Sequence, residues 1–204
     1  GLKSSWMDDK VQFNATYYHM GWDNMQVELV DPAFRIGEPW QQVVANLGDG
    51  TVKGIDVDLK AVVGNVQFGF NMTNIFDAYV NPLTEIPDAR FEGGMAPLGL
   101  EEKSDLPLFG DLSYSLYTEY AGPINLFGDG TQGFARIQHS YNGESLNTLN
   151  ESGNAPKLTQ GDYRITDIMM GFDVGDWSAQ LSLNNITDER GISYRDVSDF
   201  DTYY

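Results

Sequence analysis

The stretch GIDVDLKAVVGNVQFGFNMT, residues 54–73, contains two alternating patterns joined by a two-residue turn. Apolar residues occupy every second position from Ile55 to Val63 and again from Val66 to Met72. A period of two is typical of β-strands with one apolar and one polar face, and Gly64-Asn65 is a turn sequence. The stretch therefore predicts a β-hairpin.

The same alternation recurs along most of the chain, and no segment shows a convincing helical period. We predict an all-β fold, an antiparallel up-and-down meander of about eight strands. The expected strands cover approximately residues 1–7, 11–30, 48–63, 66–76, 107–121, 133–143, 161–174 and 177–187.

Short and long connections alternate between these strands. The short ones are residues 7–10, 64–65, 123–129 and 175–176, and the long ones are 31–47, 77–106, 144–160 and 188–204. In a meander, all short turns then lie at one end and all long loops at the other. Transmembrane β-barrels have this asymmetry.

The two faces of the strands differ in chemistry, as in a transmembrane barrel with an apolar outer face and a polar interior. Asp56 and Asp58 are then expected to line the lumen. Aromatic residues near both strand ends resemble interfacial girdles: Trp6, Phe127 and Trp177 at the short turns, and Tyr17, Tyr18, Trp22 and Tyr114 towards the long loops. A soluble barrel with its apolar side inward gives the same alternation.

The composition excludes several function classes. Twelve Lys and Arg against 30 Asp and Glu give a net charge of −18, which disfavours nucleic acid as a partner. The absence of cysteine excludes disulfides and thiolate chemistry. No apolar run approaches the roughly 20 residues of a membrane helix.

Three stretches together resemble the β-barrel of TonB-dependent outer-membrane receptors. They are GDGTVKGIDVDLK at residues 48–60, WSAQLSLNNITDER at 177–190, and the opening GLKSSWMDDKVQFNATYY at 1–18. Each motif is loose, but their order and spacing also fit, so the resemblance covers essentially the whole chain. It identifies residues 1–204 as a C-terminal segment of such a barrel.

The resemblance carries further expectations. The family barrel has about 22 strands, and its plug domain and closing strand are absent from this sequence. The implied function is active import of a scarce nutrient across the bacterial outer membrane. The implied partners are outer-membrane lipid, a small-molecule ligand and, through the missing N-terminal part, the TonB complex. An iron–siderophore complex is the commoner ligand, and an oligosaccharide or vitamin is next.

No motif predicts catalysis or a cofactor, and we expect the chain not to be an enzyme. The spacing of Gly128, Gly130 and Gly133 matches a dinucleotide-binding loop, but a strand pattern follows it, so a glycine-rich turn is expected. The same interpretation applies to Gly48 and Gly50. Asp196, Asp199 and Asp201 are weak candidates for calcium, which prefers oxygen ligands.

Ligand contacts in such receptors come, as the resemblance implies, from the long loops, the upper barrel wall and the plug. Arginine could grip an anionic siderophore, and an aromatic ring could stack on a sugar or catechol. The loop candidates are Arg35, Trp40, Arg90, Phe91, Tyr141, Tyr194 and Arg195.

Two other hypotheses remain open: a self-contained small outer-membrane barrel acting as an adhesin or structural wall, and an edge-paired β-assembly. Eight strands that do not close leave two unpaired edges, which recruit other strands. Such a sheet must pair with further strands, close on itself, or self-associate.

Overall fold

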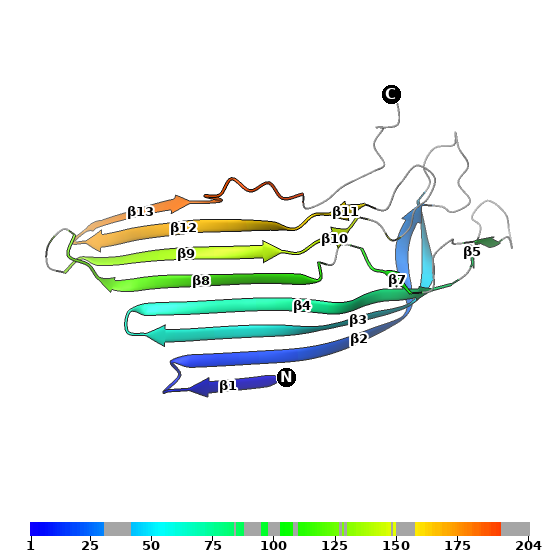
Figure 1. Cartoon of the computed structure of the whole chain (residues 1–204), viewed down its shortest axis with the longest axis horizontal. Helices are drawn as coiled ribbons and strands as arrows, with labels where there is room; N and C mark the ends of the chain where they lie inside the picture. The colour runs from blue at the N-terminus through cyan, green and yellow to red at the C-terminus, as the bar shows by residue number, and fades with distance from the viewer. Residues whose placement is uncertain are drawn as a thin grey trace, which may run out of the picture.

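The computed structural model describes residues 1–30, 42–83, 85–87, 95–97, 103–107, 110–126, 128, 130–147, 149 and 158–192. It contains one large antiparallel sheet, and the strand neighbours follow chain order (Figure 1). Its long strands are β1 (Leu2–Trp6), β2 (Val11–Val30), β3 (Gln42–Val63), β4 (Val66–Pro82), β8 (Leu112–Pro123), β9 (Gln132–Asn142), β12 (Tyr163–Val174) and β13 (Trp177–Leu183). The predicted eight-strand meander is confirmed.

Short strands lie in the long connections. β7 (Ser104–Asp105) pairs with β4, and two small hairpins are formed by β5 (Glu85–Pro87) with β6 (Met95–Pro97) and by β10 (Ser145–Leu146) with β11 (Thr159–Gln160). Among the described residues there is no helix long and apolar enough to cross a membrane.

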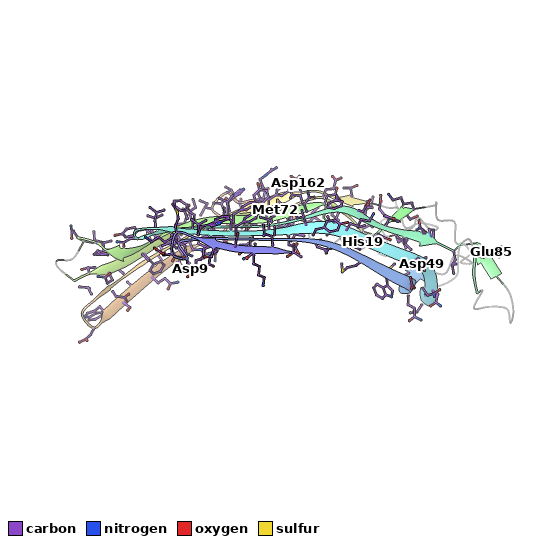
Figure 2. All side chains as sticks on the ribbon, turned by 90° about the horizontal axis from the view of Figure 1, so that it is seen from below. Asp9, His19, Asp49, Met72, Glu85 and Asp162 are labelled. Atoms are coloured by element: carbon purple, nitrogen blue, oxygen red, sulfur yellow. The ribbon has the colours of Figure 1, made fainter. Side chains whose placement is uncertain are left out.

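The predicted asymmetry of the two sheet ends is also confirmed. In Figure 1 the turns that join β1 to β2, β3 to β4, and β12 to β13 lie at the left, and the strand ends that lead into the long connections lie at the right. Figure 2 views the sheet edge-on, with Asp9 towards one end and Asp49 and Glu85 towards the other. The three-residue run Met7, Asp8 and Asp9 has positive φ throughout, which reverses the chain between β1 and β2.

Four predicted strand boundaries were wrong by four residues or more. β8 begins at Leu112 rather than at residue 107, and β13 ends at Leu183 rather than at 187. The other two errors arise where a bulge breaks the alternation. β3 begins at Gln42 rather than at residue 48, since Leu47 is an extra residue between the pairs Met25–Gly48 and Gln26–Asn46. β4 continues to Pro82 rather than ending at 76, since Phe76 is an extra residue between the pairs Gly54–Ile75 and Lys53–Asp77. Each bulge shifts the side-chain pattern by one position.

The first bulge also corrects the interpretation of Gly48 and Gly50, which lie inside β3 and not in a turn. Gly48 has φ +139, and a Cβ there would clash with the carbonyl of Asn81 on β4. By contrast, Gly128 and Gly130 do lie in the β8–β9 connection with φ of 102 and 91, so the prediction of a glycine-rich turn holds there.

A small apolar core lies at the long-loop end of the sheet. Met25, Leu47 and Val80 from β2, β3 and β4 are buried with Leu106 and Leu149 from the connections. The backbone N–H of Leu106 donates to the carbonyl of Ala78 at 2.9 Å. This core fixes parts of two long connections against the extended ends of the central strands.

Candidate functional site: the polar face of the sheet

Two rows of polar side chains cross the centre of the sheet. Cross-strand pairing aligns one residue from each of β2, β3, β4, β8 and β9 in each row. The rows are Thr16, Asp56, Thr73, Ser113 and Asn142, and Asn14, Asp58, Asn71, Ser115 and Ser140. We call these ten residues the polar band. A shallow hollow of about 550 Å³ lies over all of them.

Hydrogen bonds link neighbouring strands within the polar band. The side-chain amide of Asn14 donates to Asp58 Oδ1 at 2.9 Å, and the Thr73 hydroxyl donates to Asp56 Oδ1 at 2.8 Å. Neither carboxylate forms an ion pair with any residue that the structure describes. The band is thus built from amides, hydroxyls and two carboxylates, and two lysines lie near it on the same face: Lys3, which pairs with Asn14, and Lys60, two residues after Asp58.

Two tyrosine rings lie against the sheet on either side of the polar band. Tyr18 covers Gly54, and a Cβ at that glycine would lie 2.5 Å from Tyr18 Cζ. Tyr117 covers Gly69 in the same way, with its Cζ 2.5 Å from the Cβ position. A ring laid across a cross-strand glycine fills the space of the missing side chain and stiffens the pair.

An arginine lies two rows beyond the polar band, on the side of the short turns. The Arg136 guanidinium lies 3.5 Å from Glu119 Oε2, donates to Gln138 Oε1 at 2.8 Å, and stands 3.9 Å from the centre of the Tyr117 ring. These contacts occupy both terminal nitrogens of the arginine.

The opposite face of the same strands is apolar. Phe13, Leu59, Phe70 and Leu116 form one cross-strand row, and Leu59 and Leu116 are 37% and 42% exposed. Aromatic pairs lie towards the ends of this face. Trp6 stacks on Phe13 near the short turns, with ring centroids 6.5 Å apart. Tyr17 stacks on Phe76 towards the long loops at 6.2 Å.

Tyr141 is the one predicted loop ligand candidate that the structure describes, and it lies in strand β9 rather than in a loop. Its ring stacks on Tyr114 at 5.2 Å, and the Arg164 guanidinium stands 5.1 Å from its centre. Its neighbours Ser140 and Asn142 belong to the polar band and border the hollow, so the Tyr141 ring, stacked on Tyr114, lies on the opposite, apolar face.

Comparison with known proteins identifies the family of the chain. Residues 1–186 match the family model described as TonB dependent receptor-like, beta-barrel. The chain belongs to this family. No curated protein matches the chain, and no solved structure does.

The TonB-dependent receptor family consists of transport receptors of the bacterial outer membrane rather than enzymes. In such a barrel the apolar face meets lipid and the polar face lines the lumen. Leu116 and its row therefore face lipid, and the polar band faces the lumen, as predicted for Asp56 and Asp58. Eleven residues of β9, at about 3.3 Å each and tilted about 45°, rise roughly 26 Å, which suits the apolar band of a barrel.

The predicted aromatic girdle towards the long loops is wrong in part, because two of its four residues face the lumen. Tyr18 lies on the polar face over Gly54, and Trp22 shares its parity along β2. Only Tyr17 and Tyr114 of that group lie on the lipid face, because adjacent strand residues point to opposite sides.

An ion-pair cluster lies beyond the Tyr17–Phe76 pair, on the long-loop side. Lys53 Nζ is 2.9 Å from Asp77 Oδ2, and Lys103 Nζ is 3.5 Å from Asp77 Oδ1. The hydrogen bond from Lys53 lowers the pKa of Asp77, and the same bond raises the pKa of Lys53. Lys103 also stands 4.3 Å from the centre of the Tyr79 ring. The cluster ties the connection before β8 to the extended part of β4.

The remaining predicted site residues lie outside the described residues. They are the ligand candidates Arg35, Trp40, Arg90, Phe91, Tyr194 and Arg195, and the calcium candidates Asp196, Asp199 and Asp201. Within the described part of the chain, no group of three or more His, Asp or Glu residues could hold a metal ion.

Most of the polar band was not singled out from the sequence. Its residues are common strand polars, and only the cross-strand register brings them into two rows. The available signal was the run of Asn, Thr and Ser at alternating positions in consecutive strands.

Proposed function

We infer that residues 1–204 form a C-terminal segment of the barrel of an outer-membrane receptor that actively imports a scarce nutrient. The observation that carries this proposal is the family match over residues 1–186 on a sheet with one apolar and one polar face. The importer would meet lipid through the apolar face, and energy from the TonB complex would reach it through a part of the protein outside this sequence.

The long connections would make the first contact with the ligand. Arg35, Trp40, Arg90, Phe91, Tyr194 and Arg195 remain the proposed contacts there. Tyr141 is set apart from them, because its ring stacks on Tyr114 on the apolar face of β9. On the family resemblance alone, an iron–siderophore complex ranks first as ligand and an oligosaccharide or vitamin ranks next.

The test is energised uptake in the source bacterium. Cells lacking the gene and cells complemented with it would be supplied with radiolabelled ferric siderophores, cobalamin and oligosaccharides. We expect one class to accumulate only in complemented cells, and a protonophore to abolish that accumulation. A self-contained adhesin or structural barrel would leave the uptake of every class unchanged, which would overturn the proposal.

A complementation series would test the loop residues separately. Replacement of Arg90 and Phe91 by Ala is expected to raise the apparent KM for uptake, because a cationic and a stacking contact are lost together. The matched control replaces Asp88 and Glu92 by Ala in the same segment. Equal effects of both changes would remove Arg90 and Phe91 as ligand contacts.

A further inference from the structure

The apolar face contains a hollow over β9, in the half of the sheet towards the short turns. Two β9 residues on this face are small there, Gly133 and Ala135, whereas Ile137 at the centre of the strand is a large side chain that is 48% exposed. Cross-strand pairing places Tyr120 of β8 on one side of Ala135 and Met170 of β12 on the other. The small residues therefore lie in a depression between larger side chains.

The hollow has a volume of about 450 Å³, and its lining is apolar in character. None of the described residues that line it is charged, and Ala179 and Leu181 extend it beyond β12 to β13. The row from Phe13 to Leu116 on the same face differs, because it has a large side chain on each of its four strands. The depression is thus a local feature of this face.

Hydrogen bonds hold the wall of the hollow on the β8 side in place. The Tyr120 hydroxyl donates to the carbonyl of Pro123 at 2.6 Å, and the backbone N–H of Ile124 donates to the carbonyl of Thr131 at 3.0 Å. The Ile124 side chain lies over Gly133, since a Cβ at that glycine would be 2.6 Å from Ile124 Cδ1. The backbone at the end of β8 therefore fixes the shape of this wall.

The hollow lies at the depth of lipid acyl chains. Ala135 and Gly133 are two and four residues from the centre of β9, which at about 3.3 Å per residue and a tilt of about 45° is roughly 5 and 9 Å from mid-depth. Trp177 lies on the same face, one row beyond Ala179 towards the turns, and is 78% exposed. Tryptophan is enriched at the membrane–water interface, so Trp177 marks the edge of the hydrocarbon region just beyond the hollow.

The orientation of the sheet decides which lipid the hollow meets. The short turns of such barrels face the periplasm, so the hollow opens to the periplasmic leaflet, which consists of phospholipids. Lipid tails are as apolar as the lining, so no hydrophobic driving force favours filling the depression. An acyl chain is retained there by van der Waals contacts with a floor and two walls, and an empty depression would forfeit those contacts.

An acyl chain fits the hollow better than a second copy of the receptor does. The outer surface of a barrel is convex, so a second copy could place only a few side chains in a depression of about 450 Å³. A flexible acyl chain can follow β9 from Gly133 to Ile137, a distance of roughly 13 Å at about 3.3 Å per residue.

We propose that this hollow is a binding site for one acyl chain of a phospholipid of the periplasmic leaflet. Ala135 forms its floor, and Tyr120 and Met170 form its walls. The site goes beyond the general contact of the apolar face with lipid, because it is one place on that face at which a lipid is retained. The inference rests on the assignment of the apolar face to lipid and does not depend on the nutrient imported.

The test measures phospholipid bound to the full-length receptor. The receptor would be delipidated in detergent, titrated with dioleoylphosphatidylethanolamine and analysed by native mass spectrometry, which counts bound lipids and subunits. We expect one lipid to bind more tightly than the others. Ala135→Phe fills the hollow and is expected to weaken the binding of that lipid about tenfold, because the ring takes the place of the acyl chain.

Ala61→Phe is the matched control. Ala61 lies on the same apolar face, in the cross-strand row of Ile137, but outside the hollow. We expect this variant to leave the lipid affinity unchanged. Heat-modifiable mobility in gels establishes that each variant is folded. Ala135→Leu replaces Ala135→Phe if that protein does not fold, and it is expected to weaken lipid binding in the same direction.

A second measurement places the lipid in a bilayer. The full-length receptor would be reconstituted in phosphatidylcholine vesicles that contain a phosphatidylcholine with a photoactivatable diazirine in its acyl chain. We expect crosslinks to residues 132–137 and 168–172 to exceed those to residues 57–61, which lie on lipid-facing β3. Ala135→Phe should remove this excess, and Ala61→Phe should not.

Four results would overturn the proposal: no lipid binds more tightly than the others, Ala135→Phe binds that lipid as tightly as the parent, the crosslinks are equal in the two parts of the sheet, or Ala135→Phe dissociates a dimer without changing lipid binding. The last result would identify a second copy as the occupant. Any of them would leave the importer intact if energised uptake persists. Absence of energised uptake would refute the importer and leave the lipid site to be decided by its own measurements.

Discussion

Replacing either of two adjacent residues of β8 by lysine should change the stability of the receptor by very different amounts. Leu116 lies on the apolar face and is 42% exposed, whereas Ser115 lies on the polar face within hydrogen-bonding reach of Ser140 at 3.3 Å. We therefore expect Leu116→Lys to destabilise the receptor in lipid strongly and Ser115→Lys to be nearly neutral.

The size of the effect follows from depth in the membrane. β8 has 12 residues, and Leu116 lies about 1.5 residues from its centre, which at about 3.3 Å per residue and a tilt of about 45° is roughly 3.5 Å from mid-depth. A lysine on the lipid face near the midplane costs about 2–4 kcal/mol. At about 1.4 kcal/mol per tenfold, the folded-to-unfolded ratio should fall roughly 30- to 700-fold. At Ser115 the new ammonium reaches lumen water, and only about 1 kcal/mol or less of hydrogen bonding is lost.

The assay is equilibrium unfolding of the full receptor in phosphatidylcholine vesicles, followed by heat-modifiable mobility across a guanidinium series. Equal losses for the two variants, or a larger loss for Ser115→Lys, would refute the assignment of the faces. A Leu116→Lys penalty that is unchanged without lipid would instead support a soluble barrel with its apolar side inward.

Three further predictions address other parts of the sheet. A spin label on Ile137→Cys, at the centre of β9 on the apolar face, should be relaxed by oxygen more than by a nickel chelate; the reverse order would place that face in water. The hydrogen bond from Lys53 lowers the pKa of Asp77, so its stabilising effect is present above the ordinary carboxyl pKa and is lost as the pH falls through the lowered value. The difference in melting temperature between the parent and Asp77→Asn should therefore vanish in acid, and a difference independent of pH would contradict the ion pair. Gly54→Val should destabilise the receptor by about 1–3 kcal/mol, because its Cβ would lie 2.7 Å from a backbone carbonyl of β4 and displace the Tyr18 ring; unchanged stability in guanidinium would exclude that packing.

The sequence was sufficient to predict the order and number of the long strands, because alternation is a local property of each strand. It failed where the backbone departs from regular pairing. The bulges at Leu47 and Phe76 each insert one residue, so the apolar positions change parity and the strand pattern appears to stop. A bulge is stabilised by contacts with the partner strand, and those contacts cannot be recognised within a single segment.

The candidate site was less predictable for a related reason. Asp56 and Asp58 could be placed on the polar face by parity alone, and the structure shows them there. Their neighbours Thr73 and Asn14 lie 17 and 44 residues away in sequence, and only the register brings them within hydrogen-bonding distance. Parity alone could have separated Tyr18 from Tyr17, since adjacent strand residues point to opposite faces, but only the register shows that Tyr18 lies opposite Gly54.

The polar band lies on strands that have a partner on each side. It crosses β2, β3, β4, β8 and β9, each of which is paired on both sides, so the backbone ladder fixes the spacing of its side chains. β1 and β13 each have one described neighbour, and an unpaired strand edge in hydrocarbon costs several kcal/mol per backbone group. In lipid these two edges therefore require further strand partners, whereas the register of the band is already set by the strands between them. The backbone ladder of these inner strands thus pre-organises the side chains of the polar band.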